Sequence, residues 1–149
     1  MDKILFVCSG NTCRSPFAEK YFNKLARELN ISSLAASAGL FTFGDETPSQ
    51  NAITASAAFG VDKEMSHHRS TPITAEMLVE ANYVLTMSKS HLELVKKAIE
   101  DGIPIKEGQI QALLGNGIED PYGGSVSDYE NCYKQISEAV KAFIEANYK

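Results

Sequence analysis

ILFVCSGNTCRSPF, residues 4–17, joins an apolar run to a small polar loop and then to the start of a helical pattern. Residues 4–7 are apolar without alternation, which predicts a short strand buried on both faces. Ser15 suits the N-cap of a helix and Pro16 suits its first position. Apolar residues then recur at helical spacing as far as Leu29, so the loop is predicted to connect a buried strand to a helix N-terminus.

The rest of the chain continues this alternation of strand and helix patterns. Further strands are predicted at 33–40, 83–87 and 110–113, and helices at 49–59, from Thr74, at 90–99 and at 128–148, whereas 65–69 reads as a short strand or an extended loop. Alternating strands and helices indicate a parallel sheet covered by helices on both faces. Ligands of such sheets bind beyond the carboxyl ends of the strands, and the first strand ends at Cys8.

Length and composition narrow the class of protein. A chain of 149 residues with 44% hydrophobic residues predicts a single domain, residues 1–149, with a substantial core. A net charge of -5 argues against a nucleic-acid partner, and no apolar run approaches the roughly 18 residues that a membrane span needs. Three cysteines without framework spacing, and no signal peptide, predict a cytoplasmic protein with reduced thiols.

The loop after the first strand has the features of an anion site. Gly10 and Asn11 tolerate a positive φ angle, which lets successive backbone N–H groups turn inward. The N-terminus of the following helix adds its positive end. Arg14 adds a planar, permanently charged fork suited to phosphate.

Cys8 is the candidate nucleophile of this loop. In a field of inward N–H groups and a guanidinium, its thiol is expected to ionise readily, with a hydrogen bond from Ser15. The alternative is a buried structural cysteine beside a surface arginine. The spacing C-x5-R between a strand and a helix favours the functional interpretation, because it lets Cys8 and Arg14 address one tetrahedral anion.

CSGNTCRS followed by Pro16 resembles the loop of the low-molecular-weight protein tyrosine phosphatases. SAG at 37–39, SHHRS at 66–70, YVLTMSKSH at 83–91 and EDPYGG at 119–124 follow in the family's order. The resemblance implies a flavodoxin-like three-layer α/β sandwich with a central four-stranded parallel sheet, and no cofactor or metal. It also implies that phosphate is bound by Ser9, Gly10, Asn11, Thr12, Cys13, Arg14 and Ser15.

Asp120 is the candidate general acid and base. Phosphoryl transfer to a thiolate leaves a poor leaving group that must be protonated, and the phosphocysteine must later be attacked by water. By itself, an Asp before Pro121 in a glycine-rich segment is a common turn residue. Its match to the family's DP motif makes Cys8, Arg14 and Asp120 the predicted catalytic set.

Asn11 is expected to hold the loop in shape together with Ser15. The resemblance implies that a serine and a histidine anchor this asparagine, here Ser37 and His67, although His67 also fits a surface residue. His68 and His91 have no partner at a metal-ligand spacing, so no metal site is predicted.

Three residues favour the bacterial protein arginine phosphatase branch of the family. Thr12 stands where most tyrosine-selective members are expected to carry isoleucine. Tyr122 is followed by two glycines rather than by a second aromatic residue, and Phe41 is placed at a pocket wall. A hydroxyl acceptor and two stacking rings suit a phosphoguanidinium. A tyrosine phosphatase is the alternative, and either enzyme would act on phosphorylated proteins.

Other functions with the same loop are disfavoured by what the sequence lacks. A thioredoxin-coupled arsenate reductase needs further cysteines near the middle of the chain, and the third cysteine here, Cys132, lies on the last helix. A non-catalytic phosphate-binding module or a flavin protein would need neither Cys8 nor Asp120. Cys13, five residues after Cys8, is predicted to form a disulfide with it on oxidation.

Overall fold

The computed structural model describes residues 2–102, 110–114 and 117–148. Its centre is a four-stranded parallel sheet in the order β2-β1-β3-β4. The strands are β1 (Lys3–Cys8), β2 (Leu34–Gly39), β3 (Tyr83–Thr86) and β4 (Ile110–Ala112). Five of the six residues of β1 are buried, as an apolar run without alternation predicts.

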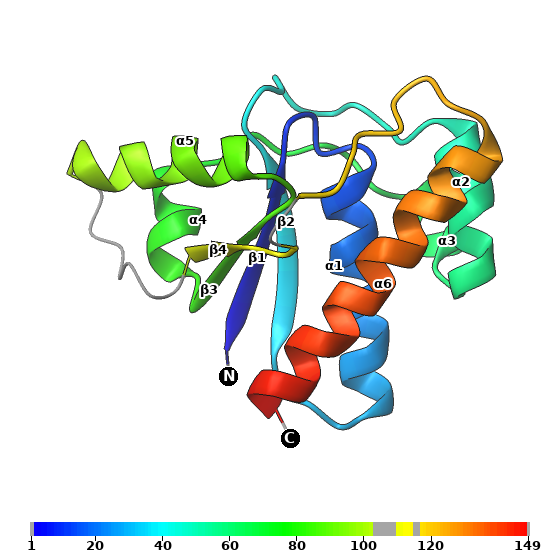
Figure 1. Cartoon of the computed structure of the whole chain (residues 1–149), viewed down its shortest axis with the longest axis horizontal. Helices are drawn as coiled ribbons and strands as arrows, with labels where there is room; N and C mark the ends of the chain where they lie inside the picture. The colour runs from blue at the N-terminus through cyan, green and yellow to red at the C-terminus, as the bar shows by residue number, and fades with distance from the viewer. Residues whose placement is uncertain (1, 103–109, 115–116, 149) are drawn as a thin grey trace.

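Helices cover both faces of the sheet, which makes three layers (Figure 1). They are α1 (Arg14–Glu28), α2 (Gln50–Ser56), the 3-10 turn η1 (Ala57–Phe59), α3 (Asp62–Ser66), α4 (Ala75–Glu80), α5 (Lys89–Glu100) and α6 (Val126–Tyr148). The three-layer α/β sandwich with a four-stranded parallel sheet is confirmed. In the described part of the chain, no helix is both long and apolar enough to cross a membrane.

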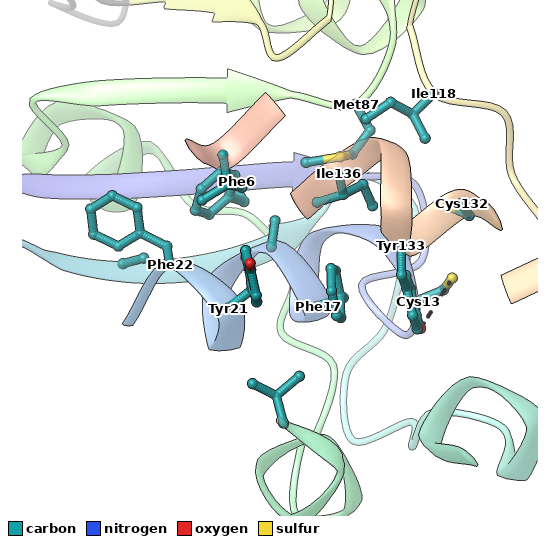
Figure 2. Packing of buried hydrophobic residues seen from close by; sticks show 14 of the residues in the cluster. Phe6, Cys13, Phe17, Tyr21, Phe22, Met87, Ile118, Cys132, Tyr133 and Ile136 are labelled. Carbon is teal, nitrogen blue, oxygen red and sulfur yellow. Dashed lines mark hydrogen bonds between the residues drawn. The ribbon is translucent and has the colours of Figure 1, made fainter. Parts of the chain in front are cut away.

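Alternate residues of β1 feed two separate cores. Ile4 and Phe6 pack with α1 and α6, whereas Leu5 and Val7 pack with α4 and α5. The larger core reaches the loop after β1, because Phe17 of α1 stacks on Tyr133 of α6 with ring centroids 4.0 Å apart (Figure 2). Tyr133 also contacts the loop, because its hydroxyl lies 3.6 Å from Cys13 Sγ.

Two details of the predicted elements were wrong. Helix α1 begins at Arg14 with Cys13 as its N-cap, so Ser15 and Pro16 lie inside its first turn. The Ser15 hydroxyl contacts Cys8 and Asn11 rather than capping the helix, and Pro16 is tolerated there because the first-turn N–H groups need no helical partner. Residues 65–69 were predicted as a short strand or an extended loop; Met65 and Ser66 instead form the end of the short helix α3, and residues 67–69 follow it outside any helix or strand.

The strand order creates a switch point at the centre of the sheet. From β1 the chain moves outward to β2 and then returns across β1 to β3, so the connections after β1 and β3 leave the sheet in opposite directions. Crevices outside the carboxyl ends of such strands are the usual ligand sites. Here the loop after β1 and the start of α5 after β3 meet at that place.

Candidate active site

Cys8 is the last residue of β1 and lies at the base of the loop. Its side chain is buried, and its Sγ lies 2.9 Å from Ser15 Oγ and 3.3 Å from the backbone nitrogen of Asn11, which donates to it. Ser15 Oγ already accepts a hydrogen bond from Asn11 Nδ2, so its own hydrogen is free to act as a second donor to the sulfur, and two such donors suit a negative charge there. The predicted contact between Cys8 and Ser15 is confirmed.

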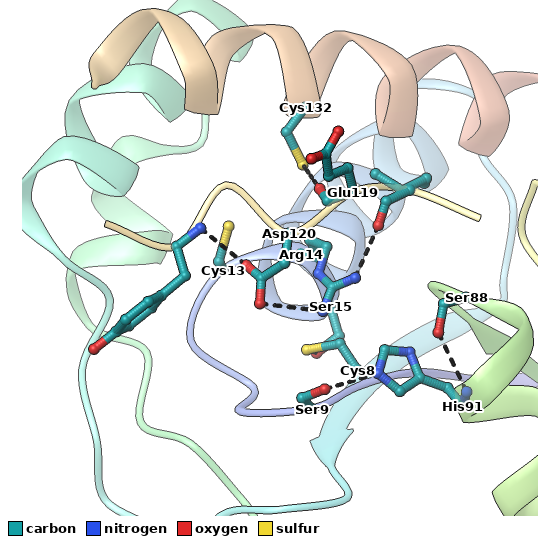
Figure 3. A network of polar contacts seen from close by, with 12 residues as sticks. Cys8, Ser9, Cys13, Arg14, Ser15, Ser88, His91, Glu119, Asp120 and Cys132 are labelled. Carbon is teal, nitrogen blue, oxygen red and sulfur yellow. Dashed lines mark hydrogen bonds and ion pairs between the residues drawn. The ribbon is translucent and has the colours of Figure 1, made fainter. Parts of the chain in front are cut away.

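Arg14 is buried beside the loop and is held in a fixed orientation. Its Nη1 donates to the carbonyl oxygen of Ile118 at 2.8 Å, and its Nη2 lies 3.5 Å from Asp120 Oδ2 (Figure 3). The segment that carries Ile118 is itself tied to the end of β3, because its N–H donates to Met87. The structure therefore brings Asp120, from a distant part of the sequence, to Cys8 and Arg14 at the two ends of the loop.

Asp120 stands opposite the loop on a tight turn. Its Oδ1 accepts the N–H of Tyr122 at 3.0 Å, which is an Asx turn, and about half of its side chain remains exposed. The turn role that the residues alone suggested is real, and it leaves Oδ2 pointing towards Arg14. The same carboxylate can thus shape the segment and face an anion in the loop.

Asn11 organises the loop from inside. It is fully buried at φ 55°, the left-handed conformation that asparagine tolerates. Its Nδ2 donates to Ser15 Oγ at 2.8 Å and to Ser37 Oγ at 2.9 Å, and its Oδ1 accepts the N–H of Thr71 at 2.9 Å. The predicted anchor Ser37 is confirmed. Gly10 does not need the positive φ angle expected of it, since only Asn11 adopts one in the loop.

The histidine that anchors Asn11 is His68, and the prediction of His67 was wrong. His68 Nε2 lies 2.9 Å from the backbone oxygen and 3.2 Å from the side-chain oxygen of Asn11. His67 is exposed at the end of α3, where its Nδ1 lies near the carbonyl of Lys63. The helical turn of α3 directs Met65 and His68 inward and leaves His67 outside. Burial lowers the pKa of His68.

The anchoring network continues to a residue that the sequence did not single out. Ser37 Oγ donates to Glu19 Oε1 at 2.5 Å, and Glu19 also pairs with Lys20. Glu19 lies one helical turn after Ser15 on α1, so its spacing from Ser15 was the available signal. At Gly39 the backbone of β2 also lies very close to the loop, because a Cβ there would be 2.8 Å from the carbonyl oxygen of Ser9.

Ser9 and His91 form a second contact that the sequence did not indicate. His91, in the first turn of α5, places Nε2 2.8 Å from Ser9 Oγ (Figure 3). Burial and the Arg14 charge lower the pKa of His91 to about 4, with Asp120 opposing them. The neutral ring thus joins the first residue of the loop to the element after β3.

Cys13 points away from the anion loop's centre into the aromatic core. Its Sγ accepts a hydrogen bond from the Tyr133 hydroxyl at 3.6 Å. A hydrogen bond with the thiol of Cys132, together with burial, raises the pKa of Cys13 well above its ordinary value. Cys13 is therefore a protonated, packed thiol within the loop.

A pocket of about 480 Å³ opens above Cys8. It is lined by Cys8, Ser9, Gly10, Asn11, Thr12, Cys13, Arg14, Phe41, Glu46, Thr47, Ser49, Asp120, Tyr122 and Tyr129. Of the residues predicted to set selectivity, Thr12 lies within the loop, whereas Phe41 and Tyr122 stand exposed at the mouth. All three face the same opening.

The arrangement at this switch point defines a class of protein. A sulfur at the end of a central strand, a buried guanidinium and a carboxylate opposite them suit the transfer of a phosphoryl group to cysteine and then to water. The chain matches the family model described as low molecular weight phosphotyrosine protein phosphatase over residues 3–149.

Individual relatives point to two substrates. A protein-arginine-phosphatase of Bacillus subtilis (strain 168) is 29% identical, covering 93% of this chain and 91% of the relative. A low molecular weight phosphotyrosine protein phosphatase of Sus scrofa is 33% identical, covering 95% and 93%. The crystal structure of a YwlE mutant from Bacillus subtilis superposes with a TM-score of 0.86 at 26% identity, covering all of both chains.

The chain belongs to the low molecular weight phosphotyrosine protein phosphatase family. It is accordingly a protein phosphatase with the cysteine-based site of that family.

Proposed function

We propose that the protein removes phosphate from phosphoarginine side chains of proteins, through a phosphocysteine intermediate on Cys8. The observation that carries the choice of arginine is the lining of the pocket, where Thr12 shares one cavity with two carboxylates, Asp120 and Glu46. A phosphoguanidinium presents N–H groups beyond its phosphorus, and these need acceptors. A phenyl ring presents none.

The aromatic residues at the mouth support the same choice. Phe41 is 68% exposed and Tyr122 is 86% exposed, so both side chains are accessible to a ligand. A planar guanidinium stacks favourably on such rings. Gly123 and Gly124 follow Tyr122, so the segment after Asp120 adds a single aromatic side chain to the wall of the pocket.

The first half of the reaction uses Cys8, Arg14 and the loop. The thiolate of Cys8, stabilised by Ser15 and by the N–H of Asn11, attacks the phosphorus in line with the leaving group. Arg14 and the inward N–H groups of the loop stabilise the charge on the phosphoryl oxygens. The bond from phosphorus to the departing guanidinium nitrogen breaks, and Asp120 donates a proton to that nitrogen.

The second half regenerates the enzyme. Asp120, now ionised, accepts a proton from a water molecule, which attacks the phosphorus of the phosphocysteine. The sulfur–phosphorus bond breaks, Cys8 leaves as a thiolate and inorganic phosphate is released. The distance of 3.5 Å between Arg14 Nη2 and Asp120 Oδ2 supports a role for this carboxyl group beside the anion site.

Tyrosine phosphatase activity is the second candidate. It is favoured by the aromatic lining, since Phe41, Tyr122 and Tyr129 all line the pocket, and by the 33% identity to the phosphotyrosine phosphatase of Sus scrofa. Both candidates share the same machinery of Cys8, Arg14 and Asp120. They differ in the group bonded to the phosphorus that the pocket must hold, which is a guanidinium in one case and a phenyl ring in the other.

Replacing Thr12 with isoleucine tests the choice between the two substrates. Thr12→Ile removes an oxygen and adds apolar volume while keeping a β-branched side chain. Loss of a hydrogen bond to a charged group costs about 1.5–3 kcal/mol, or roughly ten- to a hundredfold in rate. We expect kcat/KM for a phosphoarginine peptide to fall at least about tenfold, while kcat/KM for the matched phosphotyrosine peptide holds or rises.

Two control variants separate the oxygen from the volume. Thr12→Val removes the oxygen at nearly constant shape, so it should lower phosphoarginine hydrolysis, whereas Thr12→Ser keeps the hydroxyl and should preserve it. An equal fall for both peptides in Thr12→Ile would show that Thr12 supports the loop and does not select the substrate.

Oxidation by peroxide is expected to inactivate the enzyme reversibly. Peroxide converts the Cys8 thiolate to a sulfenic acid. Cys13 must then leave its packed position beside Tyr133 and lose its proton, after which its sulfur attacks Cys8, forms a disulfide and releases water. A dithiol reductant then restores both thiols. We expect peptide mapping after mild peroxide to find Cys8 joined to Cys13 and activity to return fully on reduction.

Two cysteine-to-serine variants serve as controls for this experiment. Cys13→Ser should leave Cys8 open to irreversible oxidation, so reductant would no longer restore activity. Cys132→Ser removes the other thiol near Cys13 and should leave the reversible inactivation intact. Recovery that is equally complete in Cys13→Ser would refute the disulfide.

The setting of the activity is also part of the proposal. Phosphorylated proteins are the substrates that the family membership supports. A cytoplasmic location is supported by the uneven number of cysteines and by a nucleophile that must stay reduced to work.

A further inference from the structure

His91 is placed beside the anion loop by the topology of the sheet. It lies in the first turn of α5, directly after β3, whose carboxyl end is next to that of β1. Its backbone N–H donates to the N-cap residue Ser88 at 3.2 Å, which fixes the turn. The side chain is 4% exposed and points at the loop (Figure 3).

One nitrogen of the buried ring has no partner. Nε2 lies 2.8 Å from Ser9 Oγ, whereas Nδ1 is the only buried side-chain nitrogen or oxygen without a hydrogen bond among residues 2–102, 110–114 and 117–148. A buried N–H without an acceptor is rarer and more costly than a buried lone pair without a donor. We therefore assign the ring hydrogen to Nε2 and the lone pair to Nδ1.

The charge state of His91 agrees with that tautomer. The burial of the ring and the guanidinium of Arg14 disfavour a second proton, and Asp120 acts in the other direction. A neutral ring has a single N–H. With that N–H on Nε2, His91 donates to Ser9, and the Ser9 oxygen is the acceptor.

This assignment leaves the hydroxyl hydrogen of Ser9 unused. A serine hydroxyl has one donor and two acceptor positions, and the contact with His91 fills an acceptor position. The Ser9 backbone is fixed as well, because its carbonyl accepts the N–H of Phe41 at 2.9 Å. Ser9 lines the pocket above Cys8, so the remaining hydrogen is available to an anion there.

We propose that His91 is a positioning residue for phosphate binding: its Nε2–H holds the Ser9 oxygen, which directs the Ser9 hydroxyl hydrogen to the phosphoryl group. The loop then binds the anion with one side-chain O–H in addition to its backbone N–H groups and Arg14. This inference rests on the proposed phosphatase function only in taking phosphate as the ligand. It is independent of whether the leaving group is arginine or tyrosine.

A set of substitutions with matched geometry tests the proposal. Gln places its amide nitrogen near the position of histidine Nε2, so His91→Gln keeps the donor, whereas His91→Asn and His91→Leu lose it. Ser9→Ala removes the hydroxyl itself. The affinity for inorganic phosphate is measured by calorimetry, and KM and kcat are measured with para-nitrophenyl phosphate.

The expected pattern is specific. His91→Leu, His91→Asn and Ser9→Ala should each weaken phosphate binding about tenfold and raise KM similarly, whereas His91→Gln should keep most of the affinity. The double variant Ser9→Ala with His91→Leu should bind no more weakly than either single variant, because both remove the same donor. The rate of Cys8 alkylation by iodoacetamide should stay near the wild-type value in all of them.

Three results would overturn the proposal. They are phosphate binding by Ser9→Ala that is as tight as in the wild type, phosphate binding by His91→Gln that is as weak as in His91→Leu, and addition of the two single losses in the double variant. A wild-type protein that binds phosphate but hydrolyses no phosphate ester would instead contradict the proposed function. The phosphate affinities of the variants would still decide the role of His91 in that case.

Discussion

Cys8→Ser is expected to abolish turnover while preserving the site. A serine hydroxyl is not ionised near neutral pH, and the hydrogen bonds that stabilise a Cys8 thiolate, from Ser15 and the N–H of Asn11, supply no base to activate it. We expect kcat to fall by at least roughly 10⁴-fold. Inorganic phosphate should still bind, because Arg14 and the loop are unchanged, and calorimetry beside a phosphatase assay measures both.

The chain offers a matched control for this change. Cys132→Ser makes the same replacement of sulfur by oxygen at a buried position on α6, and it should retain activity. In the wild type, rapid quenching with acid should trap phosphate on Cys8. Residual hydrolysis by Cys8→Ser near the wild-type rate would contradict the nucleophile assignment outright.

Asp120→Ala is expected to slow the reaction according to the leaving group. General acid catalysis contributes roughly 10²- to 10⁴-fold where the departing group needs a proton. A phosphoarginine peptide or phenyl phosphate should lose that full factor in kcat. An aryl phosphate with a strongly acidic phenol should lose much less in its first step, which a burst of released phenol would report.

Asp120→Asn separates the chemistry of this residue from its role in the turn. Asparagine keeps the oxygen that accepts the N–H of Tyr122, so the turn is preserved, but it cannot give or take the proton. It should therefore be as slow as Asp120→Ala with poor leaving groups. Near-normal activity in Asp120→Asn, or equal losses for good and poor leaving groups, would remove Asp120 from the acid role.

The parts of the site that the sequence predicted are those built from local pattern. The apolar run of β1, the C-x5-R spacing and the tolerance of Asn11 for a positive φ angle are all set within a few neighbouring residues. The amphipathic pattern of α6 was equally clear, and the apolar residues that recur on one face of the helix are buried: Tyr129, Tyr133, Ile136, Val140, Phe143 and Ile144. Such features follow from backbone geometry and from the period of hydrophobic residues.

The choice between adjacent histidines could not be made from the sequence. Which of His67 and His68 faces Asn11 depends on the single turn of α3, a five-residue helix with no capping side chain. Short helices of this kind depend on packing, here of Met65 into the core, and not on local propensity. The sequence-based prediction was wrong by one position, and it therefore chose the outward-facing His67 in place of the inward-facing His68.

The contacts of Glu19 with Ser37 and of His91 with Ser9 could not be predicted from the sequence for a different reason. Ser37 meets Glu19 across 18 positions and Ser9 meets His91 across 82. Contacts between residues so far apart in the sequence can be predicted only when the order of the strands is known, because they depend on β2 and β3 lying on either side of β1 in the sheet. The sequence showed a polar residue at each position, and the sheet order determined its partner.

Hydrolysis of a mixture of two peptides tests the central claim most directly. The peptides share one sequence and carry either phosphoarginine or phosphotyrosine at the same position, so that only the leaving group differs. Competition between them gives the ratio of the kcat/KM values in a single reaction, followed by mass spectrometry. The pocket lining that Thr12 shares with Asp120 and Glu46 predicts that phosphoarginine is consumed at least about tenfold faster, and equal or faster loss of phosphotyrosine would contradict the arginine assignment.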